Sequence, residues 1–254
     1  MMNAKEVVGA MWDALMTAGD PNAIDTYVDL HYRQHSPYVK DGPEGLRDLL
    51  ATLRPDYRYE LVRIIGNQEF AVMHGIHHNW LNGVFTGGEA VVGFDMFRVK
   101  DDKIAEHWDA SIPRLHVSAS GRSQLDGPTA VGQPQLTNAS QSAGEAYVQT
   151  VLIDGHRDKL PVLVRSDVKQ HRPEIDDGLE ALQNALAESN QHYDKILHVI
   201  AEGEFVAVHS SGNVRQQPYS FWDLLRVDDQ GLIAEQWQVA AVYPDIVVHD
   251  NGPY

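Results

Sequence analysis

The chain contains two copies of one sequence pattern. The segment YRQHSPYVKDGPEGL at residues 32–46 recurs as VKQHRPEIDDGLEAL at residues 168–182, and KIAEHWDAS at residues 103–111 recurs as LIAEQWQVA at residues 232–240. Two copies are too few for a solenoid, which stacks three or more repeats. The repeat therefore predicts two homologous domains in tandem, and by symmetry we expect them to pack as an intramolecular pseudo-dimer. A further homo-oligomer of the chain is left open.

The region between the copies has a different composition. Residues 115–145 are rich in Gly, Ser, Pro and Asn and show neither the helical nor the strand period. We therefore predict an N-terminal domain at residues 1–115, a linker at residues 116–140 and a C-terminal domain at residues 141–254.

Each copy changes its period once along the chain. In the first copy, apolar residues recur at helical spacing in residues 7–16 and 46–53, and a further helix is indicated between them. From about residue 57 to residue 112 the period becomes two, which indicates four antiparallel strands. Helices followed by a meander of strands predict the α+β class, with three helices on one side of a curved antiparallel sheet in each copy.

Composition excludes several classes of function. The chain carries 20 Lys and Arg against 36 Asp and Glu, a formal net charge of −16, so binding to the phosphates of nucleic acid is disfavoured. It has no cysteine, which excludes thiolate nucleophiles and thiolate metal ligands. No stretch approaches the roughly 18 apolar residues of a membrane span. We expect a soluble cytoplasmic protein with neither a nucleic-acid nor a membrane partner.

A hairpin in the first copy places two carboxylates opposite each other. If the turn of FDMFRVKDDKIAEHWDA lies at residues 101–103, Arg98 faces Glu106 and Asp95 faces Asp109. Opposed carboxylates repel, and in a partly buried place one of them keeps its proton near neutral pH. With His107 on the same face, the pair is typical of a general acid/base site.

The second copy keeps the hairpin and loses the acid pair. The same register pairs Arg226 with Glu235 but leaves Asp223 opposite Gln238, which can form an ordinary hydrogen bond. Opposed acids on a strand pair can also lie solvated on an exposed face. Phe97 shares the face with the acids of the first copy, and this apolar neighbour favours a ligand pocket.

Two histidines recur in both copies and allow two interpretations. His35 recurs as His171 and His74 as His209, although the second copy lacks the acid pair, which favours a structural role. We nevertheless list four residues as candidates for substrate binding: His35, His74, Phe97 and Trp12.

A zinc site is the alternative use of the histidines. It could be formed by His74, His78, His107 and an Asp, but no tight ligand spacing supports it, so we predict no metal.

The motifs QH-x-P, DG-x-x-G and FD-x-FR…EHWD, with GRSQLDGP at residues 121–128, resemble those of the SnoaL-like polyketide cyclase family. This family belongs to the nuclear transport factor 2-like superfamily, and the resemblance extends over nearly the whole chain, within a bacterial branch of aldol-condensation-type proteins. It implies a cone-shaped α+β barrel with three helices over a curved sheet, a deep apolar pocket, and dimers formed through the sheets.

The resemblance also implies a chemistry. In the cyclases the aspartate that matches Asp109 is the acid/base of an intramolecular aldol ring closure that needs neither metal nor cofactor. A histidine of the family stands where Asp95 falls here, which is a departure. Related pockets carry out ketosteroid isomerisation, dehydration or epoxide opening. The second copy departs at EQWQ, so its pocket is expected to lack this chemistry.

These observations together predict a cofactor-independent acid/base enzyme that acts on a small apolar carbonyl compound in the N-terminal domain. Asp109 is the expected base, with Asp95 or His107 as its protonated partner, and the C-terminal domain is the structural half. The alternative is a non-catalytic small-molecule-binding or scaffold protein, because a chain that tolerates one pocket without acids can tolerate two.

Overall fold

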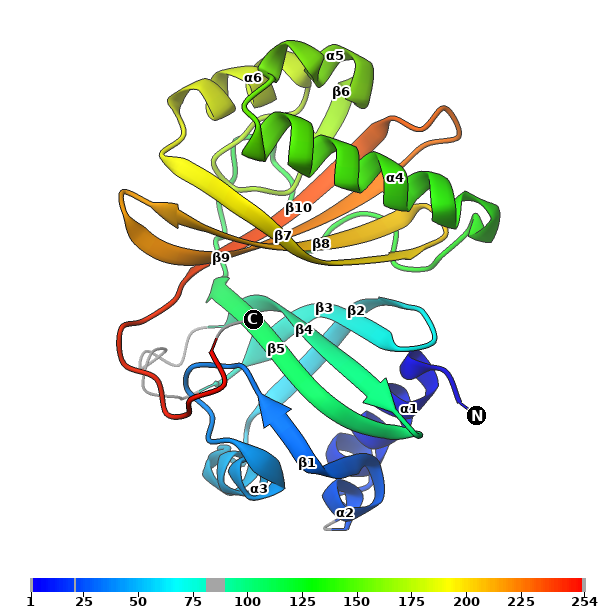
Figure 1. Cartoon of the computed structure of the whole chain (residues 1–254), viewed down its shortest axis with the longest axis vertical. Helices are drawn as coiled ribbons and strands as arrows, with labels where there is room; N and C mark the ends of the chain where they lie inside the picture. Colours follow the sequence, from blue (N-terminus) through cyan, green and yellow to red (C-terminus); the bar gives the residue numbers. More distant parts are fainter. Residues whose placement is uncertain (1, 21, 81–89, 253–254) are drawn as a thin grey trace. The chain divides into compact units, whose positions relative to one another are not determined.

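The computed structural model, which describes residues 2–20, 22–80 and 90–252, divides into two compact units (Figure 1). The first unit comprises Met1–Ala110 and Pro244–Tyr254, and the second comprises Ser111–Tyr243. This division differs from the predicted boundaries in three places. Residues 111–115 and the segment predicted as a linker, 116–140, belong to the second unit, and the residues after the second copy belong to the first.

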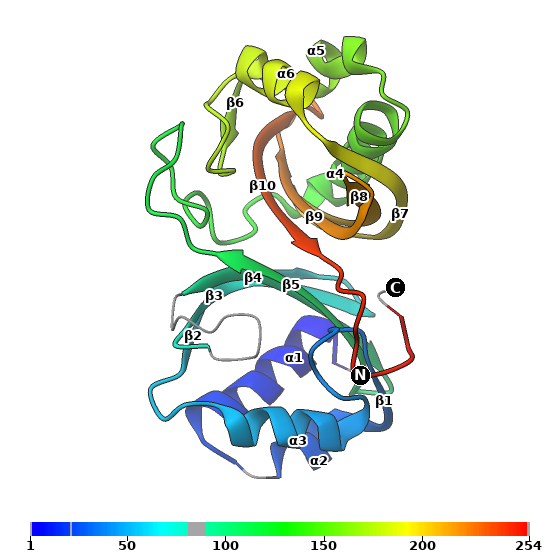
Figure 2. The same ribbon diagram turned by 90° about the vertical axis from the view of Figure 1, so that its left-hand side faces the viewer.

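The first unit places three helices on one face of a five-stranded sheet (Figure 2). Along the chain these elements are α1 (Ala4–Trp12), a π-helical turn (Asp13–Thr17), α2 (Ala23–Tyr27), β1 (Val28–Gln34), α3 (Gly42–Thr52), β2 (Arg58–Gly66), β3 (Phe70–His78), β4 (Val91–Lys100) and β5 (Lys103–Pro113). The strand order is β1-β5-β4-β3-β2. The predicted three helices and four-stranded meander are confirmed.

The second unit repeats this topology. Its elements are α4 (Thr137–Tyr147), a π-helical turn (Val148–Ile153), α5 (Leu160–Leu163), β6 (Val164–Gln170), α6 (Leu179–Glu188), β7 (Gln191–Glu202), β8 (Phe205–Val214), β9 (Gln217–Val227) and β10 (Ile233–Val242), with short 3-10 turns at Pro134–Leu136 and Arg157–Lys159. The strand order is β6-β10-β9-β8-β7. Two tandem α+β domains are therefore confirmed, whereas the pseudo-dimer stays a prediction.

One strand in each unit was not predicted. β1 and β6 lie between the second and third helices and pair in parallel with the last strand of their unit, β5 and β10. Each has seven residues and exposes about half of them, so its polar sequence merges with the neighbouring helical patterns. This strand matters because it brings the QH motif beside the last strand: Gln34 is the partner of His107, and Gln170 is the partner of Gln236.

The predicted hairpin register holds where the structure specifies it. In the second unit Arg226 pairs with Glu235 and Asp223 with Gln238. In the first unit the expected ion pair is present, because Arg98 Nε donates to Glu106 Oε1 at 3.0 Å.

The two faces of the first sheet have different neighbours. Directly opposed residues of β3 and β4 share a face, so Met73 and Asp95 lie on one face and His74 and Phe94 on the other. Met73 and Phe97 belong to the core cluster that also contains residues of α1, so the face of Asp95 is the face that the helices cover. The acid pair is thus placed on the inner face of the unit.

Among the residues that the structure describes, none of the helices has the length and apolarity needed to cross a membrane.

Glu235 provides a test of the packing in the second unit. Its carboxylate is buried and accepts from His171 Nε2 and Arg226 Nε, both at 2.8 Å. Burial raises the pKa of Glu235, but these hydrogen bonds outweigh it and the pKa is lowered. We expect Glu235→Gln to lower the free energy of unfolding at pH 7 by about 3 kcal/mol, because two cationic donors lose a buried partner.

Urea unfolding measures this loss. Because the folded pKa is lowered, the contribution of Glu235 is present at neutral pH and disappears as the pH falls through the carboxyl range, so the difference between variant and parent should shrink toward pH 3. Asp167→Asn is the control, since Asp167 pairs with Arg165 at the surface, where both side chains are exposed, and its loss should cost much less. Equal losses in the two variants would contradict this account.

Candidate functional site

The structure brings the three candidate catalytic residues together. Asp95 on β4 and His107 and Asp109 on β5 each offer one oxygen or nitrogen atom within 4.8 Å of the others. His107 is buried and the two aspartates are partly buried, so the group is not a solvated surface cluster. We refer to these three residues as the acid cluster.

A hydrogen-bond network fixes the orientation of His107. Gln34 Oε1 accepts the backbone N–H of Ser36 at 2.9 Å and lies 2.9 Å from His107 Nδ1. A backbone N–H can only donate, so it identifies the Gln34 atom as the oxygen, and His107 Nδ1 must carry a proton to donate to it. His107 Nε2 then faces Asp95 Oδ1 at 3.3 Å, and a proton is required between them, because two facing lone pairs would repel.

Asp95 is stabilised in its ionised form. Burial raises the pKa of this carboxyl, but hydrogen bonds from His107 and then His77, together with the charges of both rings, outweigh burial, and the pKa of Asp95 is lowered. His77 Nε2 lies 3.7 Å from Asp95 Oδ2, and its Nδ1 is 2.9 Å from the hydroxyl of Tyr57. Asp95 therefore holds charge, and the shared proton resides on the His107 side.

The pKa of Asp109 is shifted in the opposite direction. Burial raises its pKa; the charge of Asp95 adds to the rise, while the charge of His107 and a hydrogen bond from Ser36 counteract it in part, so the pKa remains raised. The sequence predicted that two neighbouring carboxyls would differ in this way. It did not show which of the two would have the higher pKa.

A buried hydroxyl lies beside the cluster. The charge of Asp95 contributes to a raised pKa of Tyr59, after burial as the larger cause, so the phenol keeps its proton. Within the described part of the chain its Oη has no hydrogen-bond partner. Gly75 makes room for it, because a Cβ at that position would lie 2.5 Å from the hydroxyl oxygen. An unpaired buried donor of this kind is unusual and suits a ligand oxygen.

Two of the residues predicted to bind substrate lie next to this group. The ring of Phe97 lies 4.6 Å from that of His107, and the ring of Trp12 lies 4.6 Å from that of Tyr59. Both aromatic side chains belong to the apolar cluster on the inner face of the sheet.

His35 has a structural position. Its Nε2 contacts Glu106 at 3.1 Å, its Nδ1 donates to the carbonyl of Gly252 at 3.0 Å, and its ring stacks on Trp108 at 4.6 Å. Both ring nitrogens are therefore occupied. His171 has the same set of contacts in the second unit, to Glu235, Ser123 and Trp237, so packing accounts for the recurrence of this histidine. The role of His35 in substrate binding stays a prediction.

His74 is also separated from the acid cluster. It lies on the opposite face of the sheet from Asp95, where its Nδ1 is 2.6 Å from Arg63 and its ring stacks on Phe94. The period of two on β3 places His78 on that face as well, so the zinc set of His74, His78 and His107 is not assembled.

The sequence interpretation missed four contributors to the site: Gln34, Ser36, Tyr59 and His77. Gln34 ends the unpredicted strand β1 and Ser36 follows it, so nothing placed them beside β5. His77 had a usable signal, since it is two residues from Gly75 on an alternating strand and shares its face with Asp95.

The second unit shows what the site becomes without its acid/base groups. Gln236 takes the place of His107 and still donates to the equivalent carboxylate, Asp223, at 3.1 Å. Gln238, in place of Asp109, donates to the same oxygen at 3.0 Å, and the hydroxyl of Tyr193 donates to the other at 2.8 Å. Burial still raises the pKa of Asp223, although these hydrogen bonds counteract it. The expected Asp223–Gln238 hydrogen bond is confirmed, but Asp223 is not an unperturbed carboxyl.

A family model decides the identity of the first copy. Residues 8–107 match the model described as the SnoaL-like domain. The N-terminal copy is a SnoaL-like domain. The matched residues end at His107, so Asp109 lies two positions beyond them. The match runs from the middle of α1 through α2, α3 and the strands of the first unit to the middle of β5.

Several solved structures are similar to less than half of the chain. A SnoaL-like polyketide cyclase from Agrobacterium tumefaciens is 17% identical, with a TM-score of 0.36, over 44% of this chain and 93% of its own. TsrD from Streptomyces laurentii is 24% identical, with a TM-score of 0.36, over 44% of this chain and 91% of its own.

An LEH-like epoxide hydrolase from M. tuberculosis is 18% identical, with a TM-score of 0.34, over 41% of this chain and 84% of its own. No curated protein matches the sequence. Likenesses of this degree do not transfer an activity to the SnoaL-like domain.

Proposed function

We propose that the N-terminal SnoaL-like domain is a cofactor-independent acid/base enzyme that acts on a small apolar carbonyl compound. The observation that supports this most strongly is the pair of neighbouring carboxyls whose pKa values move in opposite directions, down for Asp95 and up for Asp109. Environments that separate two titratable groups in this way are typical of acid/base sites.

Asp109 is the proposed base. A raised pKa makes its carboxylate a stronger proton acceptor than an ordinary aspartate, and closer to matching neutral pH. In the proposed reaction the carboxylate removes a proton from the carbon beside the carbonyl, and the electrons of the C–H bond move to the carbonyl oxygen to form an enolate. Return of the proton to another carbon completes an isomerisation, whereas attack of the enolate carbon on a second carbonyl gives an aldol product.

The enolate oxygen needs hydrogen-bond donors, and Tyr59 is the proposed one. Its hydroxyl is buried, protonated and without a partner in the described part of the chain. A donor that is already desolvated and oriented stabilises developing negative charge more than one that must leave water. The adjacent aromatic rings of Trp12 and Phe97 would contact the apolar part of the substrate.

Asp95 and His107 have a supporting role in this proposal. The ionised Asp95 keeps the proton on His107, and this positive charge lies within the same cluster as Asp109. It favours the ionised form of Asp109, which would otherwise be lost through burial.

The same three residues could in principle hold a divalent metal ion, since two carboxylates and an imidazole are common ligands. The contacts favour a proton between His107 and Asp95 over a metal ion. Both nitrogens of His107 are already at hydrogen-bond distance from an acceptor, Gln34 Oε1 and Asp95 Oδ1, so the imidazole has no lone pair left for a metal.

Exchange of α-protons tests the proposal without knowledge of the natural substrate. A panel of small apolar ketones is incubated in D2O with protein dialysed against EDTA, and loss of the α-proton signals is followed by NMR. We expect Asp109→Asn to reduce the exchange rate about 100-fold or more, as is typical when a general base is removed. Asp223→Asn, the equivalent carboxylate of the second copy, is the matched control and should exchange at the parent rate.

Two results would contradict the proposal. One is parent-like exchange by the Asp109→Asn variant. The other is loss of exchange on dialysis against EDTA with recovery on adding Zn²⁺, which would assign the cluster to a metal. A ketone that binds without any exchange in the parent protein would favour the alternative, a small-molecule-binding protein.

The Tyr59 hydroxyl gives a separate prediction. We expect Tyr59→Phe to reduce exchange of the best ketone in the panel about 100-fold, because one donor to the enolate is removed. Its melting temperature should stay within about 2 °C of the parent, since the hydroxyl makes no hydrogen bond within the described chain. A large drop in stability with unchanged exchange would show that the hydroxyl has a structural role.

A further inference from the structure

The loop that carries Gln34 and Ser36 is held in place by a segment from the far end of the chain. The backbone N–H of Val248 donates to the carbonyl of Pro37 at 3.3 Å, and His249 Nε2 donates to the carbonyl of Ser36 at 2.7 Å. Residues 248–252, which we call the C-terminal strap, belong to the first unit although they follow the last strand of the second copy.

Asn251 of the strap joins both ends of this loop. Its Nδ2 donates to the carbonyl of Gln34 at 3.0 Å and to Asp41 Oδ1 at 2.7 Å. The same Asp41 oxygen accepts the backbone N–H of Gln34 at 2.8 Å. Gly252 adds the carbonyl that accepts from His35. One short segment therefore contacts the backbone carbonyls of residues 34, 36 and 37 and the ring of His35.

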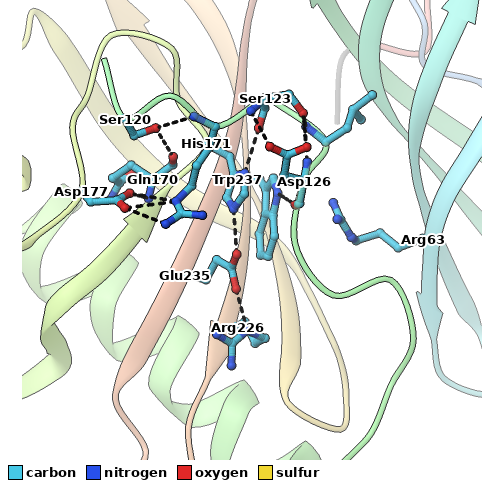
Figure 3. A network of polar contacts seen from close by, with 12 residues as sticks. Arg63, Ser120, Ser123, Asp126, Gln170, His171, Asp177, Arg226, Glu235 and Trp237 are labelled. Carbon is cyan, nitrogen blue, oxygen red and sulfur yellow. Dashed lines mark hydrogen bonds and ion pairs between the residues drawn. The ribbon is translucent and has the colours of Figure 1, made fainter. Parts of the chain in front are cut away.

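The second unit contains the same arrangement, and Figure 3 shows it. Residues 119–123, which follow the last strand of the first copy, form the connector strap on the loop of the second copy. The backbone N–H of Ala119 donates to the carbonyl of Pro173 at 2.8 Å, and the hydroxyl of Ser120 donates to the carbonyl of Gln170 at 2.9 Å.

The connector strap also matches the C-terminal strap residue by residue. Arg122 donates to Asp177, as Asn251 does to Asp41, and the carbonyl of Ser123 accepts from His171, as that of Gly252 does from His35. Residues 119, 122 and 123 correspond to 248, 251 and 252 at a constant spacing of 129, which is also the spacing of the last strands.

The two straps are thus exchanged. Each one continues the last strand of one copy and holds the QH loop of the other copy. This explains why the segment predicted to be a linker has an ordered set of contacts in the second unit.

We propose that the C-terminal strap is a positioning element of the acid cluster. It acts through the loop: Gln34 sets the tautomer of His107, and Ser36 bonds to Asp109. The second copy, which has lost its own acid pair, thereby supplies through its continuation a part that the site of the first copy requires. This inference rests on the proposed function for its activity readout only.

Two variants of the full chain test it. Asn251→Ala removes both hydrogen bonds of the Asn251 side chain, and Arg122→Ala removes the equivalent side chain of the connector strap. We expect Asn251→Ala to slow ketone α-proton exchange about 10- to 100-fold, because small displacements of positioned groups have effects of this size. Arg122→Ala should exchange at the parent rate, although it loses an ion pair of its own.

The ring nitrogens of His107 provide a readout that does not depend on activity. In protein labelled with ¹⁵N-histidine, the parent should show His107 Nδ1 protonated, because this nitrogen donates to Gln34. Asn251→Ala should add signals of the other tautomer, in which Nδ1 has no proton, and Arg122→Ala should not. His249→Ala serves as a second strap variant if Asn251→Ala fails to fold.

Parent-like His107 signals in both strap variants would overturn the inference, as would equal losses of exchange in Asn251→Ala and Arg122→Ala. If the parent protein exchanges no ketone at all, the proposed function fails but the His107 signals still test the strap. The two failures are therefore distinguishable.

Discussion

The placement of one amide oxygen governs the chemistry of the first unit. Gln34 Oε1 accepts the Ser36 N–H, which fixes the carboxamide, and it thereby requires a proton on His107 Nδ1. The other ring nitrogen must then share a proton with Asp95, which is held ionised, while Asp109 is left with a raised pKa. The different states of the two carboxyls follow from this single orientation, because without it nothing would require a proton on His107 Nδ1.

The second unit is a natural comparison within the same chain. The carboxamide of Gln236 donates to Asp223 as the ring of His107 does to Asp95, so the geometry survives while the titratable group is removed. The framework around it is unchanged: a histidine stacks on a tryptophan and contacts a glutamate that pairs with an arginine, as His171 and Glu235 show. The packing around the site can therefore persist without the acid/base residues, and only the first copy has both the packing and those residues.

Much of the fold followed from the sequence because its signals are local or repeated. The register of the hairpin rested on Arg98 facing Glu106, and the same arithmetic in the second copy gave the Asp223–Gln238 pair that the structure shows. The inner face of β4 followed from the alternation that places Phe97 with Asp95. Comparing the two copies also indicated a structural role for His35, since His171 persists without the acids.

The rest depended on contacts that are distant in sequence. Strand β1 is short and half exposed, so nothing predicted that Gln34 lies beside His107. Without that neighbour, the sequence did not determine in which direction the pKa of each carboxyl is shifted. The straps have no periodic pattern, and their polar residues resemble a linker because their bonds go to loops about 50 and more than 200 residues away. Such contacts leave no mark that composition or spacing can detect.

The carboxyl titrations of Asp95 and Asp109 test the central claim most directly. In protein labelled with ¹³C-aspartate, each carboxyl carbon can be followed by NMR across the acidic and neutral range, with the two signals assigned by the Asp95→Asn and Asp109→Asn variants. The account predicts that Asp109 titrates above, and Asp95 below, the usual value of about 4. If both carboxyls titrate near that value, the environments do not separate them, and the acid cluster is not the acid/base site described above.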